Sequence, residues 1–393
     1  MKKFNLLVPM AGRGSRFIKK GYKVPKQLIY VEDKQLLDLS LECVDISDCN
    51  LIFVVRDDQV SNFKFDKILK KKFGNDIQIV TVDHVTDGSV CSCLLAREHI
   101  DNDMPLIIHT LDVQFFPIIS PASIFTKDLD GTIFTFKSNS PNYSYVEVDE
   151  NNLATKTAEK KVISENACVG IYCFSKGSEF CKYADEMISS DTRTNNEFYI
   201  TPLYNLLIQD DCKICIKEVE KMHIFGTPSE FEFYKSNVIK KFGKKPVALC
   251  SDHSGYECKE KFKSVLEKMS IKYIDFGTHV TDDCDYKYFI DQAIMGTKDS
   301  TCDFVFGFCR TGQGVNICAN KHKGIRSALI YDEFSAEMAV RHNCANFFAF
   351  PSRLFESEND LQNIENLISI FLNNTFDGGR FQVRIQGLEN EDL

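Results

Sequence analysis

The chain contains a cysteine whose neighbours could make it reactive. Cys309 stands in FVFGFCRTGQGVNICANK, where an apolar run of strand type ends at the thiol and a glycine-containing loop leads into a helix. The amino end of a helix favours a thiolate, and the amides of such a loop can hold an oxyanion. The alternative is a buried structural thiol, because free cysteine often serves as a small core residue.

A second chemical signal lies near the amino terminus. The apolar run NLLVPMA leads directly into Gly12-Arg13-Gly14-Ser15-Arg16. Small residues at the carboxyl end of a strand let backbone N–H groups approach a phosphate, and Arg16 and Lys26 would add the cations that a triphosphate needs. An ordinary tight turn is the alternative for so short a loop.

Two successive α/β patterns must position these groups. Up to Tyr234, apolar strand-like runs alternate with helix-like stretches, which predicts a largely parallel sheet. The Lys-rich stretch KSNVIKKFGKKP predicts an exposed connection. A second α/β pattern then begins at VALCSD, and its last predicted helix runs from about Asp360 to Asn373. We therefore predict a first domain over residues 1–234, a linker over 235–245 and a second domain over 246–393.

Composition narrows the possible partners and compartments. The 393 residues carry a formal net charge of −9, so nucleic acid is a poor candidate for the main partner. No apolar run reaches the ~18–20 residues of a membrane span, and the amino terminus reads as a buried strand, not a signal peptide. The 16 cysteines are typical of a reduced, cytoplasmic protein, and the Cys212/Cys215 pair lacks the partners of a zinc set.

The first half resembles the sugar-phosphate nucleotidyltransferases. LVPMAGRGSRF…GYKVPKQLI is similar to their signature, and TDGSVCSCLLAREHIDNDMPLIIHTLDV to their nucleobase loop and metal strand. The resemblance implies catalytic roles for Arg16 and Lys26, and a Mg²⁺ ligand at Asp112. It implies a nucleotide site made of Ala11, Gly12, Gly14, Ser15 and Gly88. It implies a sugar-phosphate site made of Glu159, Lys160, Gly170 and Glu197.

The implied reaction is attack of a sugar phosphate on the α-phosphorus of a nucleoside triphosphate, with release of pyrophosphate. Such a transfer depends on positioning and charge neutralisation. One departure from the family pattern concerns the metal. Many members have a second metal-binding Asp two residues before a Gly-Thr pair, whereas here Ile224 precedes Gly226-Thr227 at that spacing.

The second half resembles ribose-5-phosphate isomerase B and its relatives that act on galactose and allose phosphates. The similar strings are SDHSGY, CRTGQG, ANKHKGIRSAL, YDEFSAEMAVRHNCAN and GGRFQVR. The resemblance makes Cys309 the base that moves a proton between C1 and C2 of an open-chain sugar, without a metal. Thr311 would assist, His342 would open the sugar ring, and Asp252 would hold the ring from the opposite side. The implied sugar-phosphate contacts are His253, Arg310, Gly312, Gly314, Asn343, Arg380 and Arg384.

The isomerase-like half departs from its family at three positions. Arg310 replaces the usual glycine after the cysteine, Phe381 replaces a frequent histidine, and Lys287 stands where proline is common. Arg310 introduces a long cation beside the proposed enediolate, where it could bind an unusual substrate or block the site. The family shares its active site between two subunits, which implies at least a homodimer through this domain.

Together the two resemblances predict two Rossmann-like α/β domains. The first would have a mixed sheet of the GT-A type, and the second a parallel sheet in an α/β/α sandwich. The implied function is bifunctional, a Mg²⁺-dependent nucleotidyltransferase joined to an aldose–ketose isomerase, which would supply a precursor for a surface or capsule polysaccharide. The alternative is a nucleotidyltransferase whose second domain has lost catalysis and serves in dimerisation or sugar-phosphate sensing.

Overall fold

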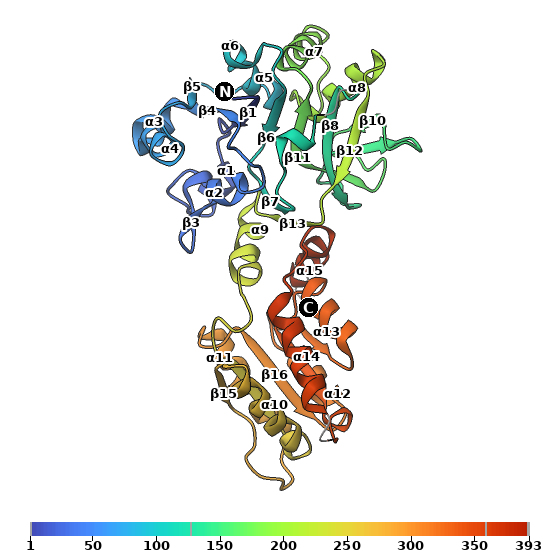
Figure 1. The fold of residues 1–393 in the computed structure, drawn as a ribbon. Helices are drawn as coiled ribbons and strands as arrows, with labels where there is room; N and C mark the ends of the chain where they lie inside the picture. Colours follow the sequence, from blue (N-terminus) through green and yellow to red (C-terminus); the bar gives the residue numbers. More distant parts are fainter. Residues whose placement is uncertain (1, 126–127, 358–359, 391–393) are drawn as a thin grey trace. The chain divides into compact units, whose positions relative to one another are not determined.

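The computed structural model describes residues 2–125, 128–357 and 360–390. The chain divides into two units, Met1–Glu232 and Phe233–Leu393, and each has its own sheet (Figure 1). Among the described residues, no helix is long and apolar enough to cross a membrane.

The first unit is built on a mixed nine-stranded sheet in which β1 is central. β1 pairs in parallel with β4 on one side and β6 on the other, and its residues are almost all buried. A central parallel strand covered on both faces requires such an apolar run. β11 runs antiparallel to both β6 and β8, which makes the sheet mixed. The strands of this sheet are β1 Phe4–Pro9, β4 Cys49–Arg56, β5 Gln78–Val82, β6 Leu106–His109, β8 Gly131–Lys137, β9 Tyr145–Val148, β10 Ala154–Ala158, β11 Asn166–Phe174 and β12 Ile214–Glu218.

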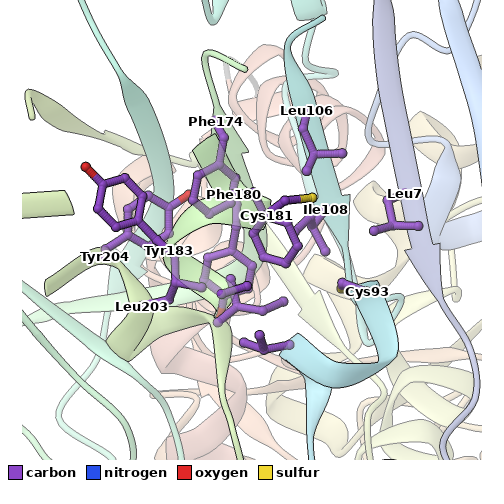
Figure 2. Packing of buried hydrophobic residues seen from close by; sticks show 14 of the residues in the cluster. Leu7, Cys93, Leu106, Ile108, Phe174, Phe180, Cys181, Tyr183, Leu203 and Tyr204 are labelled. Atoms are coloured by element: carbon purple, nitrogen blue, oxygen red, sulfur yellow. The ribbon is translucent and has the colours of Figure 1, made fainter. Parts of the chain in front are cut away.

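Helices α7 and α8 cover one face of this sheet with an apolar stripe. Phe180, Ala184 and Met187 recur at helical spacing on α7 and are buried. The ring of Tyr204 on α8 stacks on Phe174 of β11 with centroids 4.8 Å apart, and Figure 2 shows this cluster reaching β6 and β1. The helices of the unit are α1 Ser15–Lys19, α2 Leu36–Leu41, α3 Asp57–Phe63, α4 Phe65–Phe73, α5 Ser89–Leu94, α6 Arg97–Ile100, α7 Gly177–Ser189, α8 Ile200–Gln209 and α9 Pro228–Phe233. Two short ladders complete it: β2 Tyr30–Val31 with β3 Lys34–Gln35, and β7 Val113–Phe116 with β13 Lys221–Ile224.

The second unit contains a five-stranded sheet with every pair parallel, in the order β15-β14-β16-β18-β17. Alternate residues of these strands enter two separate cores. Phe306 and Phe308 of β16 pack in one core, whereas Val305 and Cys309 pack in the other. The strands are β14 Val247–Ser251, β15 Tyr273–Asp275, β16 Phe304–Cys309, β17 Ser327–Leu329 and β18 Phe347–Pro351.

Helices cover both faces of this sheet and give it three layers. Residues of α10, α13 and α14 contribute to the aromatic core, and residues of α11 and α12 contribute to the core of smaller side chains. The two predicted α/β units, one with a mixed sheet and one with a parallel sheet, are therefore confirmed. The helices are α10 Tyr256–Lys268, α11 Tyr286–Lys298, α12 Gln313–Ala319, α13 Glu333–Arg341, α14 Asp360–Asn373 and α15 Arg380–Asn390.

The structure adds to the sequence prediction at two places in this unit. α15 follows the helix that was predicted to be the last, because Ile385 packs with Phe376 and Phe233 although the segment has few apolar residues. Residues 235–245, predicted as a linker, are grouped with the second unit. Tyr234–Val238 forms a π-helix, and the ring of Phe242 lies 5.5 Å from those of Phe304 and Phe306.

Candidate active sites

The glycine loop of the first unit lies at the carboxyl edge of the parallel strands. Met10 and Ala11 are buried after β1, whereas Gly12 to Arg16 are exposed. Gly14 has a φ of 59° and begins helix α1, a left-handed conformation that glycine adopts without strain. Nothing lies within 4 Å of the point where a Cβ on Gly12 or Gly14 would be. The backbone of this loop is thus open to a ligand.

A cleft opens beside this loop. Arg13 and Ser15 line it from the loop, and Arg56 lines it from the end of β4. Strand ends at a sheet's carboxyl edge are where α/β folds bind ligands. The cleft is lined by Arg13, Ser15, Ile18, Lys19, Arg56, Asp58, Val82, Asp83, His84 and Val85.

Lys26, which follows the glycine loop in the sequence, forms an ion pair with Asp112, which follows β6. The Lys26 side chain is 11% exposed and that of Asp112 is 49% exposed, so the carboxylate remains open to solvent. The backbone N–H of Phe225 donates to the Asp112 carbonyl at 3.0 Å, and a Cβ on Gly226 would lie 3.1 Å from Asp112 Oδ2. The Gly-Thr segment therefore lies against Asp112, as the sequence motif suggested.

The donor set at Asp112 fits a magnesium ion held by one carboxylate. Ile224, at the position of the family's second Asp, is buried and offers no ligand atom. Mg²⁺ is commonly bound by one or two carboxylates together with substrate phosphates. Asp112 would hold the ion, with Lys26 contacting Oδ1 of the same carboxylate.

The predicted nucleobase loop at Gly88 and the segment that carries the predicted sugar-binding residue Glu197 lie against each other. Gly88 has a φ of 130°, and a Cβ there would lie 2.5 Å from the backbone N and O of Phe198. Phe198 N donates to Asp87 O at 2.9 Å, and Val90 N donates to Phe198 O at 3.0 Å. Gly88 and the neighbour of Phe198, Glu197, are therefore brought together by backbone contacts.

The predicted sugar side contains two pairs of hydrogen-bonded polar side chains and one glycine. Lys160 Nζ donates to the hydroxyl of Tyr199 at 3.0 Å, a residue that the sequence analysis missed although it lies two positions after Glu197. Ser144 donates to Glu159, and burial raises the pKa of that carboxyl. Gly170, with a φ of 95°, accepts from Thr110 N at 3.1 Å. Since Thr110 is two residues before Asp112, Gly170 lies close to the proposed metal ligand.

In the second unit, Cys309 and Asp252 end neighbouring strands at the carboxyl edge. Cys309 is 6% exposed, and Gly312 N donates to its carbonyl at 3.3 Å. Asp252 Oδ1 accepts from Ser254 Oγ at 2.7 Å, and Ser254 Oγ accepts from Arg310 N at 2.9 Å. Ser254 therefore connects the acid to the loop that carries the thiol.

The loop after Cys309 is shaped by two glycines. Gly312 has a φ of 70°, and a Cβ there would lie 2.5 Å from Leu329 Cδ1. A Cβ on Gly314 would lie 3.0 Å from the ring of Tyr286. Thr311, directly before Gly312 in the loop, is exposed. The turn is thus fixed against β17 and α11 and leaves the threonine hydroxyl accessible.

His253 is held in one tautomer beside this edge. Its Nδ1 accepts a hydrogen bond from Cys284 N at 3.1 Å, so the neutral ring carries its proton on Nε2. The ring is about one-third exposed. An exposed Nε2–H is a suitable donor to a phosphate oxygen.

The guanidinium of Arg310 turns to an acidic partner. Arg310 Nη1 donates to Glu356 Oε1 at 2.6 Å, and both side chains are more than half exposed. Arg310 O accepts from Arg353 N at 3.3 Å. The backbone of Arg310 is therefore fixed on both sides, whereas its side chain is free to exchange Glu356 for another anion.

The remaining predicted isomerase residues gather around Phe381. The imidazole of His342 stacks on Phe381, with centroids 4.0 Å apart and planes 14° apart. The guanidinium carbons of Arg380 and Arg384 lie 4.9 and 5.9 Å from the same ring. Burial lowers the pKa of His342, although Asp377 Oδ2 lies 3.9 Å from its Nε2. Asn343, next to His342, is exposed.

These two groups of residues lie at opposite edges of the sheet in one chain. His342 ends α13, which runs back from the carboxyl edge to the start of β18, whereas Cys309 ends β16. A six-residue parallel strand spans about 16 Å. A single chain therefore does not bring His342, Arg380 and Arg384 to Cys309.

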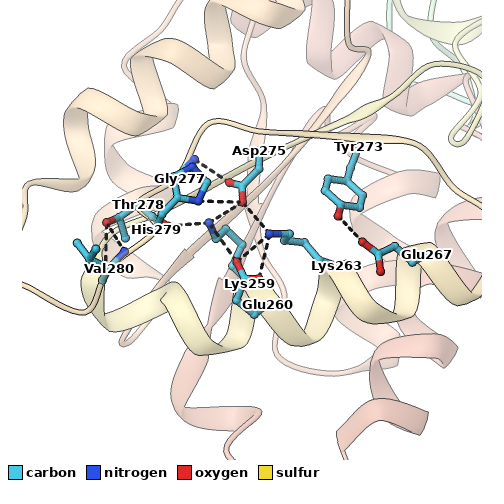
Figure 3. A network of polar contacts seen from close by, with 10 residues as sticks. All are labelled: Lys259, Glu260, Lys263, Glu267, Tyr273, Asp275, Gly277, Thr278, His279 and Val280. Carbon is cyan, nitrogen blue, oxygen red and sulfur yellow. Dashed lines mark hydrogen bonds and ion pairs between the residues drawn. The ribbon is translucent and has the colours of Figure 1, made fainter.

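A buried charge network supports the end of β14 and was not predicted. Lys259 on α10 has no exposed surface, and its Nζ donates to Asp275 Oδ2 and to Thr278 O, each at 2.7 Å. Lys263 contacts the same carboxylate at 3.2 Å (Figure 3). Thr278 N donates to Ser251 O at 3.1 Å. Lys259 thereby holds the loop after β15 against the strand that leads into Asp252.

Comparisons with known proteins agree with the two-unit division. The family model described as ribose/galactose isomerase matches residues 247–388. Ribose-5-phosphate isomerase B of Escherichia coli is 29% identical over 144 residues, which are 37% of this chain and 94% of that protein. A putative sugar phosphate isomerase of Rickettsia bellii is 32% identical over 143 residues, 36% of this chain and 96% of that protein.

The first unit matches a solved structure in fold. A nucleoside-diphosphate-sugar pyrophosphorylase from Vibrio cholerae is similar with a TM-score of 0.51 and 22% identity, over 58% of this chain and 99% of that one. The first unit therefore has the same fold as that pyrophosphorylase. Through its second unit, the chain belongs to the ribose/galactose isomerase family.

Proposed function

We propose that the protein is a bifunctional enzyme that transfers a nucleotidyl group to a sugar phosphate and isomerises a sugar phosphate between aldose and ketose. The observation that carries this proposal is that each unit has its own set of chemical groups at the carboxyl edge of its own sheet. Lys26, Asp112 and the open glycine loop form one set, and Cys309, Asp252 and Thr311 form the other.

In the isomerisation, Cys309 is the base that removes the proton from C2 or C1 and returns it to the neighbouring carbon. Thr311 assists proton exchange between the two oxygens, and the amides near Gly312 and Gly314 stabilise the enediolate. This step uses acid–base chemistry next to a carbonyl, and we propose that it needs no metal. His253 is proposed to bind the phosphate through Nε2–H.

The isomerase site is proposed to be completed by a second copy of the chain. His342, Arg380 and Arg384 lie at the other edge of the sheet, about 16 Å away by strand length. A second copy would bring its own His342 to open the sugar ring opposite Asp252, its two arginines to bind the phosphate, and its Asn343 to bind the sugar. A homodimer or larger homo-oligomer is therefore part of the proposal.

In the nucleotidyl transfer, the sugar phosphate attacks the α-phosphorus and the bond to pyrophosphate breaks. Arg16 and Lys26 would neutralise the triphosphate, and the amides of Gly12 to Ser15 would bind its oxygens. Mg²⁺ held by Asp112 would supply charge neutralisation on the leaving pyrophosphate. Glu159, Lys160, Gly170 and Glu197 would hold the sugar phosphate, with Tyr199 orienting the ammonium of Lys160.

The second candidate function is a nucleotidyltransferase with an inactive isomerase-like unit that dimerises or senses sugar phosphates. The exposed Arg310 beside the thiol loop favours this reading, because a cation stands where the family has glycine. The intact set of Cys309, Thr311 and His342 favours catalysis.

A crossed pair of variants tests the proposal. Asp112→Asn should lower pyrophosphate release by at least ~10²-fold and leave isomerisation unchanged. Cys309→Ala should lower isomerisation by ~10²–10⁴-fold and leave nucleotidyl transfer unchanged. Cys302→Ala, which removes a buried thiol elsewhere in the same core, is the control. Substrates are a panel of pentose and hexose phosphates with four nucleoside triphosphates.

The outcomes separate the candidates. If wild type isomerises none of the sugar phosphates but transfers a nucleotidyl group, the second candidate replaces the first. If Cys309→Ala abolishes both activities while the protein stays folded and oligomeric, the two-site proposal is wrong.

A further inference from the structure

Outside the two candidate active sites, helices α11 and α12 bring together a carboxylate, a thiol and an imidazole. The ligand atoms of Asp291, Cys318 and His322 all lie within 4.8 Å of one another, and each residue is partly buried. Asp291 is on α11, Cys318 is on α12, and His322 is four residues after Cys318. From these atoms we propose a zinc site that joins α11 to α12.

The residue types and their spacing suit zinc. Zn²⁺ takes Cys sulfur, His nitrogen and Asp oxygen in a tetrahedral arrangement, in which ligand atoms lie roughly 3.3–3.5 Å apart. Residues four apart lie on one face of a helix, so Cys318 and His322 can turn to one ion. After Cys318 the backbone forms successive tight turns. Lys321 N donates to Cys318 O at 3.1 Å, and His322 N donates to Ala319 O at 3.0 Å. Small side-chain rotations would bring the three ligand atoms to tetrahedral separations.

Asp291 has one carboxylate oxygen in a position to bind an ion at this site. Asp291 Oδ1 is buried and has no hydrogen-bond partner, although His322 Nε2 lies 3.0 Å from it. These two atoms form an ion pair when the ring is protonated, and a bound cation would replace that contact by ligating both of them. The other oxygen, Oδ2, accepts from Lys287 Nζ at 2.5 Å. Lys287 is therefore the outer partner that orients the carboxylate.

The proposed zinc site lies between the two helices that flank the loop after Cys309. α12 begins directly after the Cys309–Gly312 loop, and Tyr286 at the start of α11 contacts Gly314. An ion bound between these helices would tie together the two elements that flank the thiol loop. Three protein ligands would leave the fourth position to water. The site does not depend on either proposed catalytic activity.

The test uses Co²⁺ as a spectroscopic probe and Zn²⁺ as the competitor, with the full-length reduced protein. We expect one equivalent of Co²⁺ to give a thiolate-to-cobalt charge-transfer band and tetrahedral d–d bands, which Zn²⁺ removes. Cys318→Ser should abolish the charge-transfer band, and Asp291→Asn and His322→Gln should each weaken binding at least ~10-fold. Cys212→Ser, a partly buried thiol of the first unit, should bind as wild type does.

Circular dichroism of each variant checks that the chain still folds. The proposal is overturned if the wild type binds no equivalent of Co²⁺ with thiolate character. It is also overturned if Cys318→Ser retains the full signal, because one of the other 15 cysteines would then be the ligand. Loss of the band in Cys318→Ser with retention in Cys212→Ser supports it.

Discussion

The rings of His342 and Phe381 lie parallel, with centroids 4.0 Å apart, and this contact covers one face of the imidazole. Removing a group from water disfavours its charged form, which is why burial lowers the pKa of His342. Asp377 acts in the opposite direction, whereas Arg341 and Arg380 reinforce the effect of burial. The neutral form of His342 is therefore favoured, which is the form that its proposed role in opening the sugar ring requires.

This relationship predicts a pH dependence of stability. Below about pH 6.5 the unfolded chain protonates this histidine, whereas the folded chain resists protonation until a lower pH. The stability that the neutral ring contributes is complete above pH 6.5 and is lost as the pH falls through the folded pKa. His342→Gln should flatten the fall in unfolding free energy in that range, measured by urea denaturation at a series of pH values.

Phe381→Ala should raise the pKa of His342 toward its ordinary value, because water then reaches the ring. An NMR titration of the imidazole, assigned by comparison with His342→Gln, measures the change. Phe289→Ala, which removes a partly buried ring of α11 that packs against the other core, is the matched control and should leave the titration unchanged. An unchanged pKa in Phe381→Ala would show that the stacked ring is not what keeps water away.

The position of Arg310 leads to a prediction about which sugar phosphates the isomerase-like unit accepts. Its guanidinium binds Glu356 in the absence of substrate, and a planar fork suits an anion or paired oxygens of a sugar. We expect the wild type to be poor on ribose 5-phosphate, and Arg310→Gly to improve kcat/KM by about 10-fold, equivalent to ~1.4 kcal/mol. Glu356→Gln, which frees the guanidinium without removing it, should not give this gain. Efficient turnover of ribose 5-phosphate by the wild type would contradict the prediction.

The sequence was enough to predict the chemical groups at the strand ends. It was not enough to predict the side chains that hold those strand ends in place. Cys309 and Asp252 follow apolar runs, and parallel strands end at one edge of a sheet, so their proximity followed from simple rules. Lys259 was hidden because a lysine on an amphipathic helix normally faces solvent, and only the fold reveals Asp275 opposite it. The separation of His342 from Cys309 depends on the direction of α13, which periodicity alone does not give.

The burial of Lys259 predicts a large loss of stability when it is replaced, at a position outside both candidate active sites. Breaking a buried ion pair by removing one partner costs about 3–5 kcal/mol, because the other charge stays buried. Lys259→Met should approach this loss in urea unfolding of the full chain, since Asp275 is only 10% exposed. Lys263→Met, on the same helix and carboxylate but 20% exposed, should cost less. Equal losses in the two variants would contradict the proposed importance of the buried contact.

Two glycines of the first unit should respond differently to the same added methyl group: one should lose stability and the other should not. A Cβ on Gly88 would meet the Phe198 backbone at 2.5 Å, and its φ of 130° strains any other residue. Overpacking of this kind costs about 1–3 kcal/mol, so Gly88→Ala should lower the unfolding free energy of the chain. The proposed nucleotidyl transfer should also fall, because the Glu197 loop would be displaced.

Gly12→Ala adds its methyl group to open space, because nothing lies within 4 Å of that position. The unfolding free energy should therefore stay within about 0.5 kcal/mol of wild type. If the loop binds a triphosphate, however, the methyl group occupies the space that the phosphate needs, and the KM for the nucleoside triphosphate should rise about 10-fold or more. Gly387→Ala, on α15 of the second unit, is the control for KM, since its Cβ position is equally open and its backbone is not in the left-handed region. A Gly12→Ala variant with unchanged stability and unchanged KM would exclude this loop as the phosphate site.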